Sequence, residues 1–215
     1  MARLFVTGIG TGIGKTLLSA ILCEAMQADY WKPVQAGGLE KTDSMTVKAL
    51  ISNDKTKIHD ETYLLKAAMS PRAAADLESR TIDPQKFIVP SIARDIIVEG
   101  AGGVLVPLSR EFMVIDLISQ LDCQVVLLSK NYLGSINHTL LTVEALNKRK
   151  IPILGLVFNG PPNEATESII RERTELRFLG RIDEETTIDS SVVSAYAAKF
   201  RQVLHFVLRR KESDF

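Results

Sequence analysis

The sequence has few cysteines: among its 215 residues there are only two, Cys23 and Cys123. They lie far apart in the chain and neither belongs to a Cys-x-x-Cys pair, so no spacing predicts a disulfide framework or a thiolate metal site. Both stand in apolar surroundings. The sequence therefore predicts two buried free thiols in a protein of a reducing compartment.

Excess charge and long apolar runs are also absent. The 26 Lys and Arg residues balance 26 Asp and Glu residues, so the composition gives no sign of a nucleic-acid partner. No apolar run is long enough to span a membrane, and the first residues lack a secretory signal pattern. These absences favour a cytoplasmic protein with no membrane partner. The length and the 46% hydrophobic content predict one nucleotide-binding domain over residues 1–215.

The stretch at residues 6–16, VTGIGTGIGKT, carries the strongest signal. An apolar run before it predicts a buried strand, and residues 17–26 after it predict a helix. Strand, glycine-rich loop, Lys-Thr and helix is the layout of a phosphate-binding loop. Its backbone N–H groups and the helix N-terminus would surround a phosphate chain. Lys15 would reach the outer phosphates, and the Thr16 hydroxyl would hold Mg²⁺.

The spacing in this loop is a variant. The common pattern G-x-x-x-x-G-K-[ST] places a glycine where this chain has Ile9, and the glycine lies one residue earlier, at Gly8. The alternative interpretation is a glycine-rich turn that only joins a strand to a helix. The position of Gly14-Lys15-Thr16 at the start of the helix favours phosphate binding.

Three further residues are predicted to face the same crevice, because ligands gather at the carboxyl ends of parallel strands. Lys32 ends a short strand, although a solvated lysine would give the same pattern. Asp43 either caps the helix that follows or faces the metal of a nucleotide. Glu99 ends the apolar strand 95–98 before a glycine-rich loop, the usual place of a Mg²⁺-binding acid in phosphate-loop enzymes; the alternative is a turn-capping acid.

The base of the nucleotide can also be inferred. Guanine-specific relatives usually carry Asn-Lys-x-Asp at a strand end, and neither candidate here, at residues 129–132 and 159–162, matches it. ATP is therefore favoured. The Asn159 amide is a candidate for contact with the base edge, and a simple turn asparagine is the alternative.

Apolar runs alternate with helical patterns along the whole chain. This pattern predicts an α/β fold: a doubly wound, mostly parallel sheet with helices on both faces, as in P-loop NTPases. Residues 53–63 are expected to be irregular. The expected strands are 4–6, 30–32, 95–98, 124–129, 152–159 and 176–182. The expected helices are 17–26, 45–51, 112–121, 164–175 and 190–209, with one more that follows the 133–139 stretch and runs through 146. Residues 71–76 and 84–92 are each expected to form a helix or a turn.

Four stretches together resemble the dethiobiotin synthetase family. They are TGIGTGIGKT at 7–16, KPV at 32–34, EGAGG at 99–103 and LGSINH at 133–138. They occur in the order of the family and span most of the chain. EGAGG and the Gly-x-Ile-Asn-His run together are specific, whereas a phosphate-binding loop alone is not.

The resemblance implies a ligase of biotin biosynthesis. This family converts 7,8-diaminononanoate, CO₂ and ATP to dethiobiotin, ADP and phosphate. One amine becomes a carbamate, the carbamate is phosphorylated, and the second amine closes a ureido ring. Lys15 and Lys32, with Mg²⁺, would neutralise the charge that builds in the transition state. Members are homodimers, with the substrate near the subunit interface.

The resemblance also implies roles for individual residues. Metal ligands would be Thr16, Asp43 and Glu99. Catalytic residues would be Lys15 and Lys32. ATP would contact Gly12, Ile13, Gly14, Lys15, Thr16, Leu17, Asp43, Glu99, Gly100, Ala101, Gly102, Asn159, Ile182 and Asp183. The diamine substrate would contact Thr11, Lys32, Ala36, Ser135 and Asn137, the last two in the segment that binds the substrate carboxylate from the partner subunit. His138 is expected only to make a local hydrogen bond.

Two departures from the family pattern concern the amine contacts. Ala36 stands where members carry a serine, and Gly12 stands where the loop is often acidic. Two other classes stay open. A partitioning or septum-positioning ATPase would carry an early signature lysine in the loop, which is absent here. A cobyrinate-type amidotransferase would need a second domain with a nucleophilic cysteine, for which the chain has no room.

Overall fold

The computed structural model describes residues 1–91 and 93–209, and a seven-stranded sheet forms its centre. Every strand pair in this sheet is parallel, in the order β4-β2-β6-β1-β7-β8-β9. The prediction of a doubly wound parallel sheet is therefore confirmed. The strands are β1 (Arg3–Gly8), β2 (Asp29–Trp31), β4 (Ile58–His59), β6 (Ile96–Glu99), β7 (Gln124–Lys130), β8 (Ile153–Asn159) and β9 (Phe178–Ile182).

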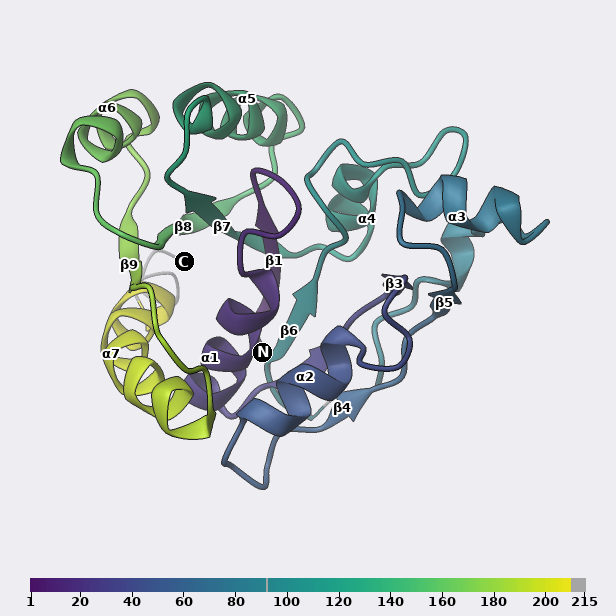
Figure 1. Cartoon of the computed structure of the whole chain (residues 1–215), viewed down its shortest axis with the longest axis horizontal. Coiled ribbons are helices and arrows are strands. Elements are labelled where there is room, and N and C mark those ends of the chain that lie inside the picture. Colours follow the sequence, from purple (N-terminus) through teal and green to yellow (C-terminus); the bar gives the residue numbers. More distant parts are fainter. Residues whose placement is uncertain (92, 210–215) are drawn as a thin grey trace.

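Helices cover both faces of the sheet (Figure 1). On one face lie α1, α2 and α7, with α1 packed against both others. On the other face lie α4, α5 and α6. Their bounds are α1 (Lys15–Met26), α2 (Asp43–Leu50), α4 (Val114–Gln120), α5 (Ser135–Lys148), α6 (Glu164–Thr174) and α7 (Ser190–Arg209). Among the described residues, no helix has the length and apolar character that crossing a membrane requires.

The core lies on both sides of the central strands. Leu4, Phe5 and Val6 of β1 are fully buried, as is the apolar run at 125–128 in β7. Continuous apolar strands of this kind are typical of a parallel sheet covered on both faces. Because β1 is the middle strand of the sheet, its end and the start of the phosphate-binding loop lie at the centre of the carboxyl edge.

A small second sheet differs from the sequence-based prediction. Residues 53–63, expected to be irregular, contribute β4 and the start of β5 (Tyr63–Leu65), and β5 pairs in parallel with β3 (Val34–Ala36). The helix α3 (Pro71–Leu77) follows β5, where the sequence predicts a helix or a turn. β3, β5 and α3 form a lobe beside the carboxyl edge (Figure 1), whereas β4 is the edge strand of the main sheet.

Over residues 84–92 the sequence predicts a helix or a turn, and the structure has a turn instead of a helix. Only a 3₁₀ turn, η1 (Pro84–Lys86), forms there, and Ile92 lies outside the described residues. The physical reason is Pro90, which lacks a backbone N–H and disfavours helical geometry in the residue before it.

Both cysteines are buried free thiols, as predicted. Burial raises the pKa of Cys23 well above its ordinary value and that of Cys123 to about 12. Since only the thiolate reacts readily, we expect neither residue to react with a disulfide reagent in the native protein at pH 8. Colorimetric thiol titration should find no fast-reacting group before denaturation and two after it. A fast-reacting thiol in the native protein would contradict this burial.

Candidate nucleotide and metal site

The phosphate-binding loop connects β1 to α1 at the carboxyl edge of the sheet. Gly12 and Gly14 adopt positive φ angles of 70° and 94°, which favour glycine, and α1 begins directly afterwards at Lys15. The Lys15 side chain is buried, and its Nζ donates to the Gly10 carbonyl oxygen at 2.7 Å. The Lys15 side chain therefore lies along the phosphate-binding loop.

Gly14 has a second reason to be glycine. A Cβ built on it would lie 2.4 Å from Asn159 Nδ2, far inside contact distance. We expect Gly14→Ala to weaken ADP binding about 100-fold or more, since it strains the loop and displaces Asn159. Isothermal titration with ADP measures this loss. Gly10→Ala is the matched control, because a Cβ there meets nothing within 4 Å and should change affinity less than threefold.

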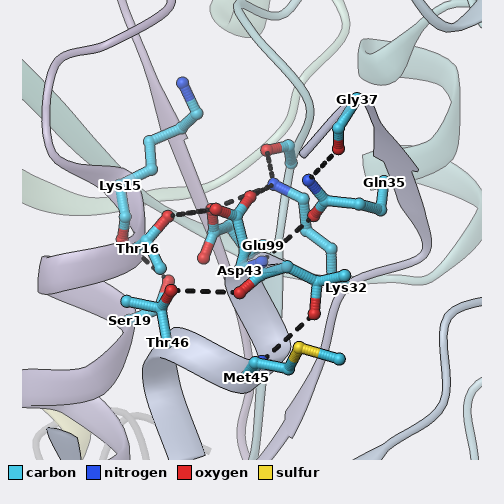
Figure 2. A network of polar contacts seen from close by, with 12 residues as sticks. Lys15, Thr16, Ser19, Lys32, Gln35, Gly37, Asp43, Met45, Thr46 and Glu99 are labelled. Carbon is cyan, nitrogen blue, oxygen red and sulfur yellow. Dashed lines mark hydrogen bonds and ion pairs between the residues drawn. The ribbon is translucent and has the colours of Figure 1, made fainter. Parts of the chain in front are cut away.

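Lys32 and Glu99 meet because their strands are in register. Trp31 of β2 pairs with Val98 of β6, so the next residue of each strand stands at the same level of the carboxyl edge. Lys32 Nζ lies 2.9 Å from Glu99 Oε1 and 2.7 Å from Asp43 Oδ2. The ammonium group thus bridges two carboxylates from different elements (Figure 2).

The Thr16 hydroxyl completes this cluster. Its Oγ1 lies 3.0 Å from Asp43 Oδ1 and 3.0 Å from Glu99 Oε1. Figure 2 shows the four side chains pointing toward one another from α1, α2, β6 and the end of β2. The structure therefore brings together the predicted metal ligands Thr16, Asp43 and Glu99, with Lys32 among them.

The charges in this cluster shift one another's pKa values. Burial alone would lower the pKa of Lys32, but the carboxylates of Glu99 and Asp43 raise it above its ordinary value. Burial would raise the pKa of Asp43, but the Lys32 ammonium and hydrogen bonds hold it below its ordinary value. Burial and the nearby Lys32 charge lower the pKa of Lys15 to about 8. Lys32 and Asp43 are therefore held in their charged forms.

This geometry rejects the alternative interpretations of Lys32 and Asp43, and it agrees with the expectation for His138. Lys32 is 4% exposed, so it is not a solvated lysine. The residue that caps α2 is Thr42, whose side chain accepts from the Met45 amide, so the capping interpretation of Asp43 is wrong. His138 makes the expected local hydrogen bond, between Nδ1 and the Tyr132 hydroxyl at 2.8 Å.

A cavity of about 550 Å³ opens over this cluster. Eleven of the predicted site residues line it: Thr11, Gly12, Gly14, Lys15, Thr16, Lys32, Ala36, Asp43, Glu99, Ala101 and Gly102. Seven further lining residues, among them Gln35 and Ala68–Pro71, were not predicted. Ile13, Leu17, Gly100, Asn159, Ile182, Asp183, Ser135 and Asn137 do not line it.

Asn159 and Ile182 lie side by side at the ends of β8 and β9. Asn159 Nδ2 donates to the Ile13 carbonyl oxygen at 2.7 Å, which ties the end of β8 to the phosphate-binding loop. Asp183 follows Ile182 directly. These residues form a second group, adjoining the loop on the side of β8. Ser135 and Asn137 are elsewhere, at the start of α5, where Ser135 is buried and Asn137 exposed.

Two residues that hold Glu99 and Asp43 in place, Tyr30 and Gln35, were not predicted from the sequence. The Tyr30 hydroxyl donates to Glu99 Oε2 at 2.9 Å. Gln35 accepts from the Asp43 amide at 3.2 Å and donates to the Gly37 carbonyl at 2.9 Å. The strand pattern contained one usable signal, because Tyr30 precedes Lys32 by two residues and alternate residues of a strand share a face. The position of Gln35 depends on the small second sheet.

Comparison with known proteins assigns the family. A protein-family model described as AAA domain matches residues 2–192. The ATP-dependent dethiobiotin synthetase BioD of Cytophaga hutchinsonii is 52% identical over 200 residues, which cover 93% of this chain and 97% of that protein. The chain belongs to the dethiobiotin synthetase family. The BioD proteins of Christiangramia forsetii and Rhodopseudomonas palustris are 46% and 43% identical, each over 93% of this chain and over 96% and 94% of their own lengths.

Membership of the dethiobiotin synthetase family confirms the resemblance drawn from four short stretches. It makes the chain an ATP-dependent synthetase, a ligase of biotin biosynthesis. Solved structures support the same fold. The cell-division ATPase MinD of Pyrococcus furiosus superposes with a TM-score of 0.58 at 15% identity, covering 94% of this chain and all of that one. A putative plasmid partition protein of Borrelia burgdorferi gives 0.59 at 14%, covering 97% and 98%. At such identities the likeness extends to the fold alone.

Proposed function

We propose that this chain uses Mg²⁺ and ATP to join CO₂ to 7,8-diaminononanoate and close the ureido ring of dethiobiotin. The convergence of Lys32, Thr16, Asp43 and Glu99 beneath one cavity is the observation that carries this proposal. A carbamate oxygen and the γ-phosphate of ATP are both anionic. Two lysines beside an oxygen-rich metal site suit a reaction between two such partners.

The donor set of this cluster fits Mg²⁺. Thr16 Oγ1 lies within 3.0 Å of two carboxylate oxygens but has one hydrogen, so it donates to one of them at a time. Such an oxygen-rich group suits a hard cation, with the remaining ligands coming from phosphate oxygens and water. Among the described residues no group of three or more His, Cys, Asp and Glu forms a metal site by itself. Bound there, Mg²⁺ would neutralise phosphate charge.

Each group of site residues has a separate role in the proposed reaction. Gly12 to Leu17 hold the phosphate chain through backbone N–H groups, and Lys15 contacts the outer phosphates. Glu99, Ala101 and Gly102 line the same cavity. Lys32 orients the carbamate oxygen toward the γ-phosphorus; a P–O bond forms as the bond to ADP breaks. The second amine then attacks the carbamate carbon, and phosphate leaves. Thr11 and Ala36 border the amines, with Ala36 contributing no hydroxyl.

Asn159, with Ile182 and Asp183, is proposed to face adenine. Nδ2 donates one of its two hydrogens to the Ile13 carbonyl oxygen, which orients the amide, and Oδ1 is its acceptor toward the base. An acceptor at this position suits the exocyclic amine of adenine and repels the carbonyl oxygen of guanine. This orientation supports the preference for ATP.

We also propose a homodimer in which Ser135 and Asn137 of one subunit face the substrate carboxylate of the other. Exposed apolar side chains around this region, Leu105, Leu133 and Leu141, support a protein interface. A hollow of about 340 Å³, lined partly by Leu105, His138 and Leu141, lies beside them.

The experiment is phosphate release with ATP, Mg²⁺ and bicarbonate, with and without 7,8-diaminononanoate. The proposal predicts strong stimulation by the diamine. Slow hydrolysis that ignores the diamine would contradict it and would favour a partner-switching ATPase instead; vesicle pelleting with and without ATP then tests that alternative.

A further inference from the structure

A buried carboxylate lies outside the cavity, on α6. Glu167 is 1% exposed. Its Oε1 accepts from Asn131 Nδ2 at 2.8 Å and from the Asn163 amide at 3.0 Å. Its Oε2 accepts from Arg181 of β9. Burial would raise the pKa of Glu167, but these hydrogen bonds hold it below its ordinary value, so the carboxylate is ionised. A charge held this deep needs such partners, and they come from three separate segments.

The partners of Glu167 also hold the loop that follows Asn159. Arg181 Nη1 donates to the Gly160 carbonyl oxygen at 3.1 Å. The Gly160 amide in turn donates to the Ile182 carbonyl at 2.8 Å. Arg181 therefore joins the ends of β8 and β9, the two segments proposed to face the base.

Asn131 and Asn163 fix the rest of this loop. Asn131 Nδ2 donates to the Pro161 carbonyl oxygen at 3.0 Å as well as to Glu167. The Asn163 backbone N–H donates a hydrogen bond to Glu167 Oε1. Three of the four residues after Asn159 are thus tied to one ionic cluster, and the carboxylate is its centre.

Aromatic rings cover this cluster. The Arg171 guanidinium lies 4.4 Å from the centroid of the Phe178 ring and 5.8 Å from that of Phe158, and its Nη2 lies 3.6 Å from Glu167 Oε2. Arg181 lies 5.7 Å from the Phe158 ring as well. Packing of this kind fixes the two guanidinium groups and restricts the movement of the loop they hold.

We propose that Glu167 is a positioning residue for recognition of the nucleotide base: it holds the 159–163 loop so that the Asn159 side-chain oxygen meets the exocyclic amine. This inference rests on the proposed function only in assigning the base to Asn159. Glu167 touches neither nucleotide nor substrate, and it acts through Arg181 and Asn131.

The test is the selectivity of nucleotide binding in Glu167→Gln, measured by isothermal titration with ADP and with GDP. Glutamine keeps the shape but leaves Arg181 without its charged partner. We expect ADP binding to weaken about tenfold, on the scale of outer-shell positioning residues, and GDP binding much less. The ratio of the two affinities should fall accordingly, with kcat and the KM for diamine nearly unchanged. Glu172→Gln, an exposed residue of the same helix, is the matched control and should change neither affinity.

A double variant identifies the route of the effect. In an Asn159→Ala background, Glu167→Gln should weaken ADP binding less than twofold, because the two residues act as one unit. Three results would overturn the inference. Glu167→Gln could weaken ADP and GDP binding equally, or it could lower Tm while ADP affinity stays unchanged. The effects of Glu167→Gln and Asn159→Ala on ADP affinity could also be fully additive. If Glu167→Gln does not fold, Arg181→Lys gives the same test, since lysine keeps the charge but cannot hold Glu167 and Gly160 together.

The binding assay contains no diamine, so its outcome is separate from that of the synthetase reaction. Loss of diamine-dependent turnover with intact ADP selectivity would defeat the proposed reaction and leave this inference standing. If Asn159→Ala alone leaves the ratio of ADP to GDP affinity unchanged, Asn159 does not contact the base, and the inference about Glu167 fails as well.

Discussion

Lys32→Ala is expected to lower kcat by about 10³-fold while ATP binding stays within a few-fold of the wild type. In the proposed reaction the ammonium group contacts the carbamate oxygen and the γ-phosphate, so its charge would matter most in the transition state. Phosphate release gives kcat, and isothermal titration gives the affinity for ATP. A variant that keeps near wild-type kcat would remove Lys32 from the catalytic residues.

Removal of Lys32 also leaves Asp43 and Glu99 without the positive charge that they share. Breaking a buried ion pair costs about 3–5 kcal/mol when one charge stays unpaired, although the partial exposure of Asp43 reduces this cost. Thermal unfolding must therefore accompany the kinetics. Lys41→Ala, at an exposed lysine of the neighbouring loop, is the control and should change neither Tm nor kcat.

Glu99→Gln is expected to raise the Mg²⁺ concentration for half-maximal activity about tenfold or more and to lower kcat about 100-fold. The amide keeps the volume and can still accept from Tyr30, but it removes the negative charge that faces Thr16 and Lys32. Titration of activity against Mg²⁺ at saturating ATP measures both effects.

The control for this variant is Glu111→Gln, because Glu111 is exposed and lies outside the cavity. ADP binding without Mg²⁺ should change little in Glu99→Gln, since the backbone of the loop and Lys15 remain. An unchanged Mg²⁺ requirement would exclude Glu99 from the metal ligands.

The residues at strand ends could be predicted from the sequence. Lys32 and Glu99 each follow or end an apolar run, and parallel strands place their carboxyl ends along one edge. Lys15 follows the glycine-rich loop and starts α1 at the same edge. The in-register pairing of β2 with β6 then brings Lys32 within 2.9 Å of Glu99. The sequence did not reveal this register, but the type of fold limited the possibilities enough for the cluster to be expected.

Residues placed by loops were harder to predict. Asp43 had two possible roles, and two structural facts separate them. Thr42 caps α2, and the Asp43 carboxylate contacts Lys32 and Thr16. Gln35 and the 68–71 segment reach the cavity through the pairing of β3 with β5, strands of three residues each. Strands this short have no periodic pattern to detect. The Glu167 cluster unites residues of three segments, which likewise leaves no local signal.

The proposed reaction fixes one CO₂ into the ureido ring for each ATP converted to ADP. Incubation with ¹³C-bicarbonate, Mg²⁺, ATP and 7,8-diaminononanoate, followed by mass spectrometry and ADP quantification, tests it directly. We predict dethiobiotin carrying one ¹³C atom, formed in equal amount to ADP and only when the diamine is present. ADP formed without labelled product, or at the same rate without the diamine, would contradict the account.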